Sequence, residues 1–395
     1  MTGSMKMTVG MDTEGISWSN VNDIRSKPRL RYVLLVSQFG AEIEASNLSK
    51  FVSSKGYEVH VITRSDRVTP WRGVIGGADV HQVLYCPRPV FLRFTAYILS
   101  FLETVRVKPD LIYGVGMFPE GLIASISAKL LHRPLIIMTM GSDVRLPNSF
   151  VVNLFWKFIL RSVRTVIVKE KESANRLTRY ANQVEIVILP NGVDQSRFML
   201  NRRECRKSIG LRRGEKMILY VGRLHPVKNV GALIAAFARV HRHFHDVKLF
   251  IVGAGPELSN LIKLAGNKHI SGSIIFVGRV SPNDVPRFMV AADVFVLPSI
   301  SEGSPSVVLE ALAAGVPVLA SNVGGVPDLV RNGQEGFLFE PGDLGQMTDL
   351  LSLVLRSHPL RKKMSKNARD RASHFPLTRT HEKILKISLD AMRTF

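Results

Sequence analysis

Short runs of apolar residues alternate along the chain with longer segments in which apolar residues recur at helical spacing. Helical spacing is clear over residues 41–55 and 119–132, for example. Short apolar runs without regular polar alternation are typical of strands that are buried on both faces of a parallel sheet. In the first half of the chain we expect strands at residues 31–36, 57–62, 109–113, 134–139 and 163–169.

A turn cluster, Leu189-Pro190-Asn191-Gly192-Val193-Asp194, interrupts this alternation, which then restarts. At 395 residues the chain is longer than one hydrophobic core usually supports. Strands separated by helices form parallel sheets that are covered on both faces. The pattern therefore predicts an α/β fold with two doubly wound, Rossmann-like domains, the second with strands at residues 216–221, 247–252, 273–277, 293–297, 316–320 and 335–340.

Four segments follow from this division. Residues 1–29 are expected to be a loose extension, because they are polar and lack the apolar core of a signal peptide. Residues 30–189 and 190–375 are the expected domains, and 376–395 a C-terminal helix that packs back toward the first domain. Ligands of such folds bind at the carboxyl ends of the strands, so we expect a site in a central cleft. No stretch of about 18 uncharged apolar residues predicts a membrane span.

The charge balance is strongly basic, with 53 Lys and Arg residues against 32 Asp and Glu residues, a net charge of +21. Such a surplus favours anionic partners, such as phosphorylated metabolites or an anionic membrane surface, although it can also serve solubility alone. No zinc-finger or RNA-recognition motif is present, so nucleic acid is not an expected partner. Two cysteines, Cys86 and Cys205, form no disulfide framework, which favours a reducing cytoplasm.

Basic residues follow the first predicted strand of the second domain. In the loop Gly222-Arg223-Leu224-His225-Pro226-Val227-Lys228, Arg223 and Lys228 are suited to a diphosphate, although cations are also common in solvated loops. The next loop, Gly253-Ala254-Gly255-Pro256-Glu257-Leu258, fails the dinucleotide pattern G-x-G-x-x-G at Leu258. We therefore do not predict NAD binding.

Two glutamates, Glu302 and Glu310, flank a predicted helix start in a mostly apolar region. Ser304 is a good N-cap, Pro305 a good first helical residue and Gly315 a good stop, so a helix is expected over about residues 305–314. A helix N-terminus attracts phosphate, and carboxylates accept hydrogen bonds from sugar hydroxyl groups. This combination favours a sugar nucleotide over the alternative that both glutamates are ordinary loop and helix residues.

These residues resemble a known family, the retaining glycosyltransferases of family 4 with the GT-B fold. The resemblance spans about residues 186–345 and includes the Glu302–Glu310 spacing and the Arg223–Lys228 loop. The other matching segments are LPNGVD, VGAGPE, FVGRV, AAGVPVLAS, GGVPDLV and EGFLFEPGD.

The resemblance implies a role for each matching residue. Arg223 and Lys228, after Gly222, would bind the donor diphosphate and stabilise the leaving group, which makes them catalytic together with Glu302. Glu302 would lie at the donor sugar and Glu310 at the ribose. The backbone of Arg279 and Val280 would meet the base, and the donor-binding backbone next to Glu302 would be Gly303, Ser304, Pro305 and Ser306.

The first domain departs from the family pattern. Its first loop has one glycine, Gly40, where the family has a Gly-Gly pair near the donor phosphate. Met140 stands where the family often has a histidine before Gly-Ser-Asp, and a thioether cannot replace the hydrogen bonds of an imidazole. Asp143 is therefore a candidate for the polar contact on the acceptor side, although a different acceptor geometry or a reduced activity would also fit.

The expected function is transfer of a hexosyl or N-acetylhexosaminyl group, with retained configuration, from a UDP- or GDP-sugar to a glycan, lipid or small-molecule acceptor (EC 2.4). No D-x-D motif occurs, so no cofactor or metal is expected; the cluster His241, His243 and His245 lacks further ligands. Alternatives are a sugar-nucleotide epimerase and a relative that binds the nucleotide sugar without turnover. The segments 91–94 (FLRF) and 155–158 (FWKF) combine apolar and cationic residues, which fits either peripheral contact with an anionic membrane from the cytoplasm or ordinary core helices.

Overall fold

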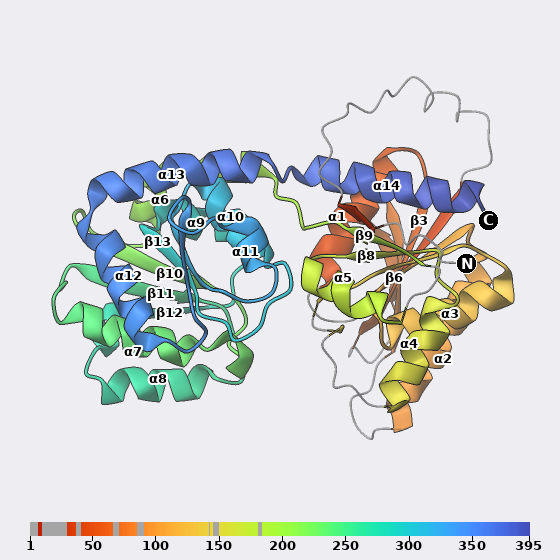
Figure 1. Cartoon of the computed structure of the whole chain (residues 1–395), viewed down its shortest axis with the longest axis horizontal. Helices are drawn as coiled ribbons and strands as arrows, with labels where there is room; N and C mark the ends of the chain where they lie inside the picture. The colour runs from red at the N-terminus through yellow and green to blue at the C-terminus, as the bar shows by residue number, and fades with distance from the viewer. Residues whose placement is uncertain are drawn as a thin grey trace. The chain divides into compact units, whose positions relative to one another are not determined.

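The computed structural model of the chain describes residues 7–9, 30–36, 41–65, 71–84, 91–141, 143–144, 150–180 and 184–395. The chain divides into two compact units, one of residues 1–190 with 381–395 and one of residues 191–380. The sequence places these boundaries at residues 189/190 and 375/376. Each unit is built on its own mainly parallel sheet with helices on both faces (Figure 1). The predicted α/β class with two Rossmann-like domains is confirmed.

The sheet of the first unit has the order β1-β9-β8-β7-β6-β2-β3-β5-β4 within the part of the chain described. Neighbouring strands are parallel except at the β4–β5 hairpin. The strands are β1 (Met7–Val9), β2 (Arg31–Val36), β3 (Glu58–Ser65), β4 (Trp71–Ile75), β5 (Ala78–Leu84), β6 (Leu111–Val115), β7 (Leu135–Met138), β8 (Thr165–Val168) and β9 (Glu185–Ile188).

Both faces of this sheet are buried, which explains why its strands read as continuous apolar runs. Successive side chains of a strand point to opposite faces. Val33 and Leu35 of β2 therefore join one core cluster, while Tyr32 and Leu34 join the other. The helices of this unit are α1 (Ala41–Ser54), α2 (Phe91–Val107), α3 (Glu120–Leu131), α4 (Phe150–Leu160) and α5 (Lys171–Thr178).

The last helix of the chain, α14 (Leu377–Arg393), also contributes to the first unit. Its residues Ile384, Leu385 and Ala391 are buried in the core cluster that contains Tyr32 and Leu34. The chain end thus covers the sheet face that α1 also covers, through the buried residues Ala45, Leu48 and Val52 of α1.

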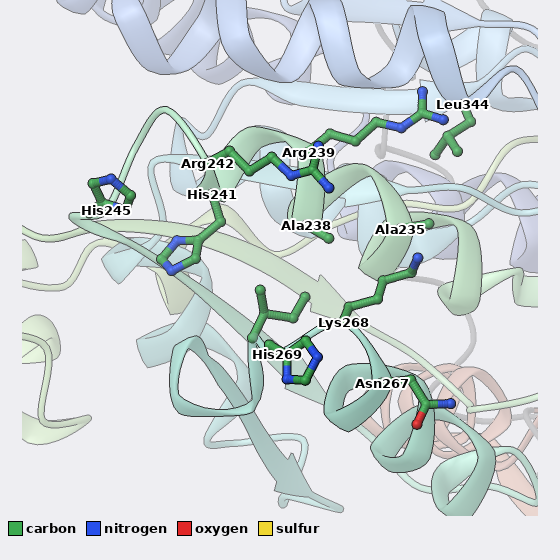
Figure 2. Close-up of a pocket in the computed structure, with 11 residues that line it drawn as sticks. Ala235, Ala238, Arg239, His241, Arg242, His245, Asn267, Lys268, His269 and Leu344 are labelled. Atoms are coloured by element: carbon green, nitrogen blue, oxygen red, sulfur yellow. The ribbon is translucent and has the colours of Figure 1, made fainter.

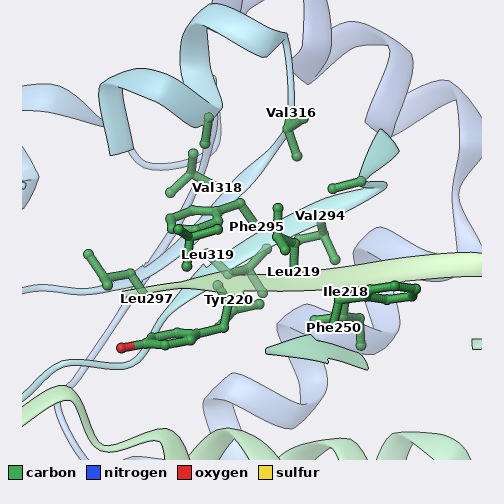
Figure 3. Packing of buried hydrophobic residues seen from close by; sticks show 14 of the residues in the cluster. Ile218, Leu219, Tyr220, Phe250, Val294, Phe295, Leu297, Val316, Val318 and Leu319 are labelled. Atoms are coloured by element: carbon green, nitrogen blue, oxygen red, sulfur yellow. The ribbon is translucent and has the colours of Figure 1, made fainter. Parts of the chain in front are cut away.

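The second unit has a six-stranded sheet of order β12-β11-β10-β13-β14-β15, with every neighbouring pair parallel. Its central strands are buried on both faces, and their side chains pack in one continuous core (Figure 3). The strands are β10 (Lys216–Val221), β11 (Val247–Val252), β12 (Ile274–Gly278), β13 (Val294–Leu297), β14 (Val318–Ser321) and β15 (Gly336–Phe339).

The helices of the second unit connect these strands and lie on both sides of the sheet (Figure 1). Short 3₁₀ turns occur at η3 (Gln195–Phe198), η4 (Pro226–Lys228) and η5 (Ser271–Ser273). The α-helices are α6 (Arg202–Ser208), α7 (Val230–His241), α8 (Leu258–Asn267), α9 (Val285–Ala291), α10 (Ser306–Ala314), α11 (Val326–Leu329), α12 (Leu344–Arg356) and α13 (His358–Ser373).

Two features of the local structure differ from what the sequence analysis gives. Residues 7–9 lie in the segment expected to be a loose extension, but they form β1, which pairs in parallel with β9. The β4–β5 hairpin was not expected, and its turn residues Gly76 and Gly77 both have positive φ, as a tight two-residue hairpin requires. Among the described helices, none combines the length and the apolar character needed to cross a bilayer.

Candidate functional site

A buried ion pair lies where two loops of the second unit meet, at the carboxyl ends of β10 and β13. The Lys228 ammonium lies 2.6 and 2.8 Å from the two carboxylate oxygens of Glu302. The Ser299 hydroxyl donates to Glu302 Oε1 at 2.5 Å. Glu302 and Ser299 are both buried, so the carboxylate is held by two specific donors. The structure thus brings together two predicted catalytic residues that are 74 positions apart.

The backbone of the two loops is also joined, because the Ile300 N–H donates to the Val227 carbonyl at 2.8 Å. Lys228 ends the short turn η4, whose N-cap His225 accepts from the Val227 N–H. Asn229 then takes a left-handed conformation and begins α7. These contacts fix the backbone that carries Lys228, so the position of its side chain is determined by the fold.

The loop after β11 supports the loop that carries Arg223. A Cβ added to Gly253 would lie 1.8 Å from the Gly222 carbonyl oxygen, and one added to Gly255 would lie 2.1 Å from the Leu224 oxygen. The Leu224 N–H donates to the Ala254 carbonyl at 3.0 Å. The glycines that resemble a dinucleotide fingerprint therefore serve close backbone packing here.

Arg223 itself has an exposed side chain directly after β10. Its carbonyl accepts a 3.0 Å hydrogen bond from the hydroxyl of Tyr220, which is buried in the same strand. Burial and, secondarily, the Glu302 carboxylate raise the pKa of Tyr220, so its hydroxyl stays a neutral donor. Sequence reasoning missed this role of Tyr220, because the residue reads as one more apolar strand position.

The helix start near Glu302 differs from the prediction. The α10 helix begins at Ser306 and has Pro305 as its N-cap, with φ −71° and ψ 110°, while Ser304 is not the N-cap. A proline φ suits both the N-cap and the first helical position, so the sequence could not separate them. The expected end at Gly315 is confirmed, because Gly315 has φ 72° and closes the helix.

This start leaves polar groups with no partner among the described residues. The N–H groups of Ser306 and Val307 have no acceptor there, and the buried hydroxyl of Ser304 has no hydrogen bond. The Asn191 amide donates to the Ser304 carbonyl at 2.8 Å and to the Ser306 hydroxyl at 2.9 Å. Asn191 belongs to the LPNGVD turn, so that motif orients the helix start.

Glu310 is half-buried inside α10, and its carboxylate has no hydrogen bond among the described residues. Burial raises its pKa to about 7, while the Arg197 guanidinium acts in the opposite direction. A carboxyl group that is desolvated in this way gains from an incoming pair of hydroxyl donors. This environment fits the expected role better than an exposed helix position would.

The remaining donor-side residues lie at the same edge of the sheet. Gly222 directly follows β10, and a Cβ on it would lie 2.7 Å from the Tyr220 hydroxyl oxygen. Arg279 is exposed and Val280 half-buried, directly after β12. The Gly253 N–H donates to the Gly278 carbonyl at 2.8 Å, which links this loop to the neighbouring one. Gly303 links its loop to the loop after β14, because the Gly303 carbonyl accepts a hydrogen bond from the Gly325 N–H at 2.8 Å.

In the first unit, both carboxylate oxygens of Asp143 accept hydrogen bonds from backbone N–H groups. Oδ2 accepts from the Met117 N–H at 2.8 Å and Oδ1 from the Met140 N–H at 2.9 Å. Burial raises the pKa of Asp143, and these backbone N–H groups oppose that rise. The Met140 side chain packs on the α1 side of the core. Contact of either residue with an acceptor stays a prediction, and Gly40 lies outside the described residues.

A second buried ion pair lies near Asp143 and was not predicted. Arg64, at the end of β3, donates to the carboxylate of Glu120 at the start of α3. The guanidinium also lies 5.1 Å from the centroid of the Tyr97 ring. Burial raises the pKa of Glu120, while Arg64 lowers it and Asp143 adds a smaller rise. A sequence signal for this pairing is lacking, since 56 positions separate its members.

The second unit offers a set of donors suited to a diphosphate and a set of acceptors suited to hydroxyl groups. Arg223, Lys228 and the α10 N-terminus supply positive charge, while Glu302 and Glu310 supply carboxylates. Within the described residues, no group of three His, Cys, Asp or Glu side chains is arranged to hold a metal ion. His241 instead bonds with the Phe244 carbonyl and the Ser273 hydroxyl.

Two family models match the chain. Residues 201–371 match the model described as glycosyl transferases group 1. Residues 40–197 match the model described as Glycosyltransferase Family 4. The first match lies in the second unit, and the second covers most of the first unit and ends at residue 197, just inside the second.

Individual proteins agree with these models. The chain is 33% identical over 323 residues to alpha-monoglucosyldiacylglycerol synthase of Streptococcus pneumoniae, covering 76% of this chain and 72% of that one. Its fold is similar to that of sucrose-phosphate synthase from Thermosynechococcus elongatus, with a TM-score of 0.81, 20% identity, and coverage of 93% and 100%. It is also similar to Anabaena HepE in complex with UDP-glucose, with a TM-score of 0.77, 19% identity, and coverage of 91% and 99%.

The half-buried Glu310 predicts a pH-dependent stability. A carboxyl whose pKa rises from 4.5 to about 7 on folding stabilises the fold below pH 4.5, and this contribution is lost as the pH rises to 7. Glu310→Gln removes that loss. We expect the variant to be more stable than the wild type at pH 8 by on the order of 2 kcal/mol and equally stable at pH 4.

Urea denaturation at several pH values measures this difference, and Glu204→Gln on the exposed face of α6 is the matched control. The control should follow the wild type at every pH. A constant difference between Glu310→Gln and the wild type from pH 4 to pH 8 would contradict the assigned environment of Glu310.

Proposed function

The chain belongs to the glycosyl transferases of group 1, family 4, and from this membership we propose that it transfers a sugar from UDP- or GDP-sugar to an acceptor with retained configuration. The family uses nucleotide sugars, and the GT-B fold of two Rossmann-like domains predicted from the motifs is confirmed. The observation that carries the proposal is the Lys228–Glu302 pair beside the unsatisfied N-terminus of α10.

In this proposal the donor diphosphate binds where positive charge converges. The Arg223 guanidinium and the Lys228 ammonium contact phosphate oxygens, and the N–H groups of Ser306 and Val307 donate to them. Glu302 contacts the donor sugar and also holds Lys228 in place. Glu310 accepts hydrogen bonds from the ribose hydroxyls, in agreement with its missing partners. The UDP-glucose in the HepE structure supports a uridine donor.

The reaction breaks the bond between the anomeric carbon and the β-phosphate oxygen, and forms one from that carbon to an acceptor hydroxyl oxygen. The departing diphosphate gains negative charge, which Arg223 and Lys228 stabilise. A phosphate oxygen of the leaving group takes the acceptor proton. We propose no metal and no covalent enzyme intermediate, because the residues assigned to the donor supply the charge needed and no further carboxylate is assigned as a nucleophile.

The first unit carries an unusual apolar surface on its α2, α3 and α4 helices, and α3 packs against both others. The exposed apolar side chains of α2 and of α3 are spaced four residues apart, which puts them on one face of each helix, and α4 adds one. Several of them are more than half exposed, whereas an isolated exposed apolar side chain is ordinary. We call this surface the apolar face, and it consists of Phe94, Ile98, Leu102, Ile126, Leu130 and Leu154.

We propose that the apolar face contacts an anionic bilayer that holds a lipid acceptor. Cations border it: Arg106 is exposed at the end of α2, and the Lys129 ammonium lies 4.0 Å from the centroid of the Phe158 ring. Apolar side chains with flanking cations are the combination that binds the headgroup region. The sequence alternative of ordinary core helices holds for Trp156, which is buried, but not for Phe94. The name of one relative, alpha-monoglucosyldiacylglycerol synthase, supports a lipid acceptor.

A thermal-shift panel of UDP, GDP, ADP and their sugar conjugates tests the donor site. A ligand that binds only the folded state raises Tm by mass action. We expect one uridine or guanosine diphosphate sugar to raise the Tm of the wild type and of Glu204→Ala, and to lose most of this effect in Glu310→Ala. A shift of equal size in Glu310→Ala would remove that residue from the site.

Turnover tests the charged residues. We expect Arg223→Ala to lower the rate of nucleoside diphosphate release from the donor by about 10²–10³ while the melting profile is kept. Glu302→Ala should lower the rate as much and should also lower Tm, because it leaves Lys228 without its partner. Arg213→Ala removes an exposed cation of a distant loop and is the control for lost charge. If the wild type releases no diphosphate with any acceptor supplied, the chain binds a nucleotide sugar without transferring it. If both variants keep the wild-type rate, the catalytic assignment is wrong.

Vesicle flotation tests the apolar face. The variant with Phe94, Ile98 and Leu102 all replaced by Ser should float about tenfold less than the wild type with vesicles of phosphatidylglycerol and phosphatidylcholine. The control replaces Val74 and Ile75, exposed apolar residues of β4, by Ser. Equal flotation of the two variants, or dimerisation of the wild type through this face instead of flotation, would contradict a membrane contact.

A further inference from the structure

A pocket of about 700 Å³ opens in the second unit, away from the residues assigned to the donor. Its walls come from the C-terminal half of α7, the end of α8 with the residues that follow, and the start of α12 (Figure 2). Parallel strands begin where the preceding helix has returned to the other edge of the sheet. The pocket therefore lies at the edge where β11 and β12 begin, whereas Arg223 and Lys228 follow the carboxyl end of β10.

The lining of this pocket is cationic. Arg239 and Arg242 extend from the end of α7, and Lys268 and His269 come from the segment after α8 (Figure 2). His241 and His245 complete the titratable side chains, and no carboxylate lines the pocket. The carboxylates next in sequence are engaged elsewhere: Asp246 pairs with Lys216, and Asp343 accepts from the Gln346 N–H.

Three side chains of the pocket are permanently cationic, and no described carboxylate pairs with them. The side chains of Arg239, Arg242 and Lys268 make no hydrogen bond or ion pair with any residue that the structure describes. Other arginines of the same unit are used: Arg206 pairs with Asp293, and Arg331 pairs with the buried Glu335. The pocket thus combines concave shape with donors that no part of the described chain occupies.

Helix ends account for only part of this charge. Both α7 and α8 end at the pocket, and each helix C-terminus carries roughly −0.5 elementary charge. The two ends together offset about one of the three positive charges of Arg239, Arg242 and Lys268, so a surplus remains. A concave surface of one charge sign concentrates the opposite ion.

One histidine of the pocket has a structural role. His241 bonds with the Phe244 carbonyl at 3.1 Å and with the Ser273 hydroxyl at 3.0 Å, and its ring stacks on Phe237. Burial lowers its pKa. His241 therefore fixes the wall between α7 and η5, and the neighbouring Arg239 and Arg242 project from a rigid backbone.

We propose that this pocket binds a phosphate-bearing anion at a site separate from the donor site. Two guanidinium groups and one ammonium group provide forked and point-charge contacts for the oxygens of one or two phosphate groups. The anion is either a soluble phosphorylated compound or the headgroup of a phospholipid. The proposal does not depend on the glycosyltransferase assignment, because none of its residues belongs to the donor site.

Calorimetric titration with inorganic pyrophosphate tests the site. We expect pyrophosphate to bind at the pocket of the wild type and to bind there at least about tenfold more weakly in the Arg242→Gln/Lys268→Gln variant. Lys362→Gln/Lys363→Gln removes the same charge from exposed positions of α13 and should bind like the wild type. Pyrophosphate also fits the donor site, so the titration is repeated with Arg223→Gln. This variant should still bind pyrophosphate at the pocket.

A second arm identifies the source of the phosphate. Vesicles with phosphatidylglycerol are sedimented with the same variants. Loss of vesicle binding in Arg242→Gln/Lys268→Gln indicates a phospholipid headgroup, whereas loss of pyrophosphate binding alone indicates a soluble compound. The proposal is overturned if this variant binds both pyrophosphate and vesicles as tightly as Lys362→Gln/Lys363→Gln does, or if Arg223→Gln alone abolishes pyrophosphate binding.

Discussion

The second unit depends on one electrostatic constraint, the burial of the Glu302 carboxylate. Desolvating a carboxylate costs several kcal/mol, so it is tolerated only where specific donors compensate it. Lys228 and Ser299 do so here, and they come from the loops after β10 and β13. Because Ile300 also bonds with Val227, neither loop can move without uncovering a charge. The pair therefore stabilises an arrangement that a donor would otherwise have to organise on binding, at a cost in affinity.

Backbone packing makes that arrangement possible. The glycines at 253 and 255 let the loop after β11 contact the backbone that presents Arg223, and any larger residue would displace it. The buried Tyr220 hydroxyl then donates a hydrogen bond to the Arg223 carbonyl, which holds that backbone in place. Two cations and two carboxylates thus come from two segments, residues 222–228 and 302–310, that are far apart in sequence. They are united because the carboxyl ends of parallel strands meet at one edge.

The local pattern of the sequence was enough for most strands and for the motif residues, but not for contacts between distant segments. The bounds of β2, β10 and β11 agree with prediction, because these buried strands are continuous apolar runs. The β4–β5 hairpin was missed although Gly76-Gly77 is a tight-turn signal, because β4 is short and largely exposed. The pairing of Arg64 with Glu120 joins residues 56 positions apart, which no local pattern encodes. Ser299 and Tyr220 bond with residues only three positions away, but their burial depends on tertiary packing.

In the first unit, Met140 stands at the position where the resemblance leads us to expect a histidine. At the end of β7, Met140 contributes only its backbone N–H, which Asp143 accepts, and its side chain packs on the core. One carboxylate oxygen of Asp143 accepts from the Met117 N–H and the other from the Met140 N–H. Only the remaining lone pairs of Asp143 could accept a hydrogen bond from an acceptor substrate. Asp143 lies close enough to raise the pKa of Glu120, and the Arg64 guanidinium lowers that pKa. The Arg64 guanidinium and two backbone N–H groups therefore already engage these carboxylates, so the polar groups of this edge first hold β3, α3 and the loop after β7 together.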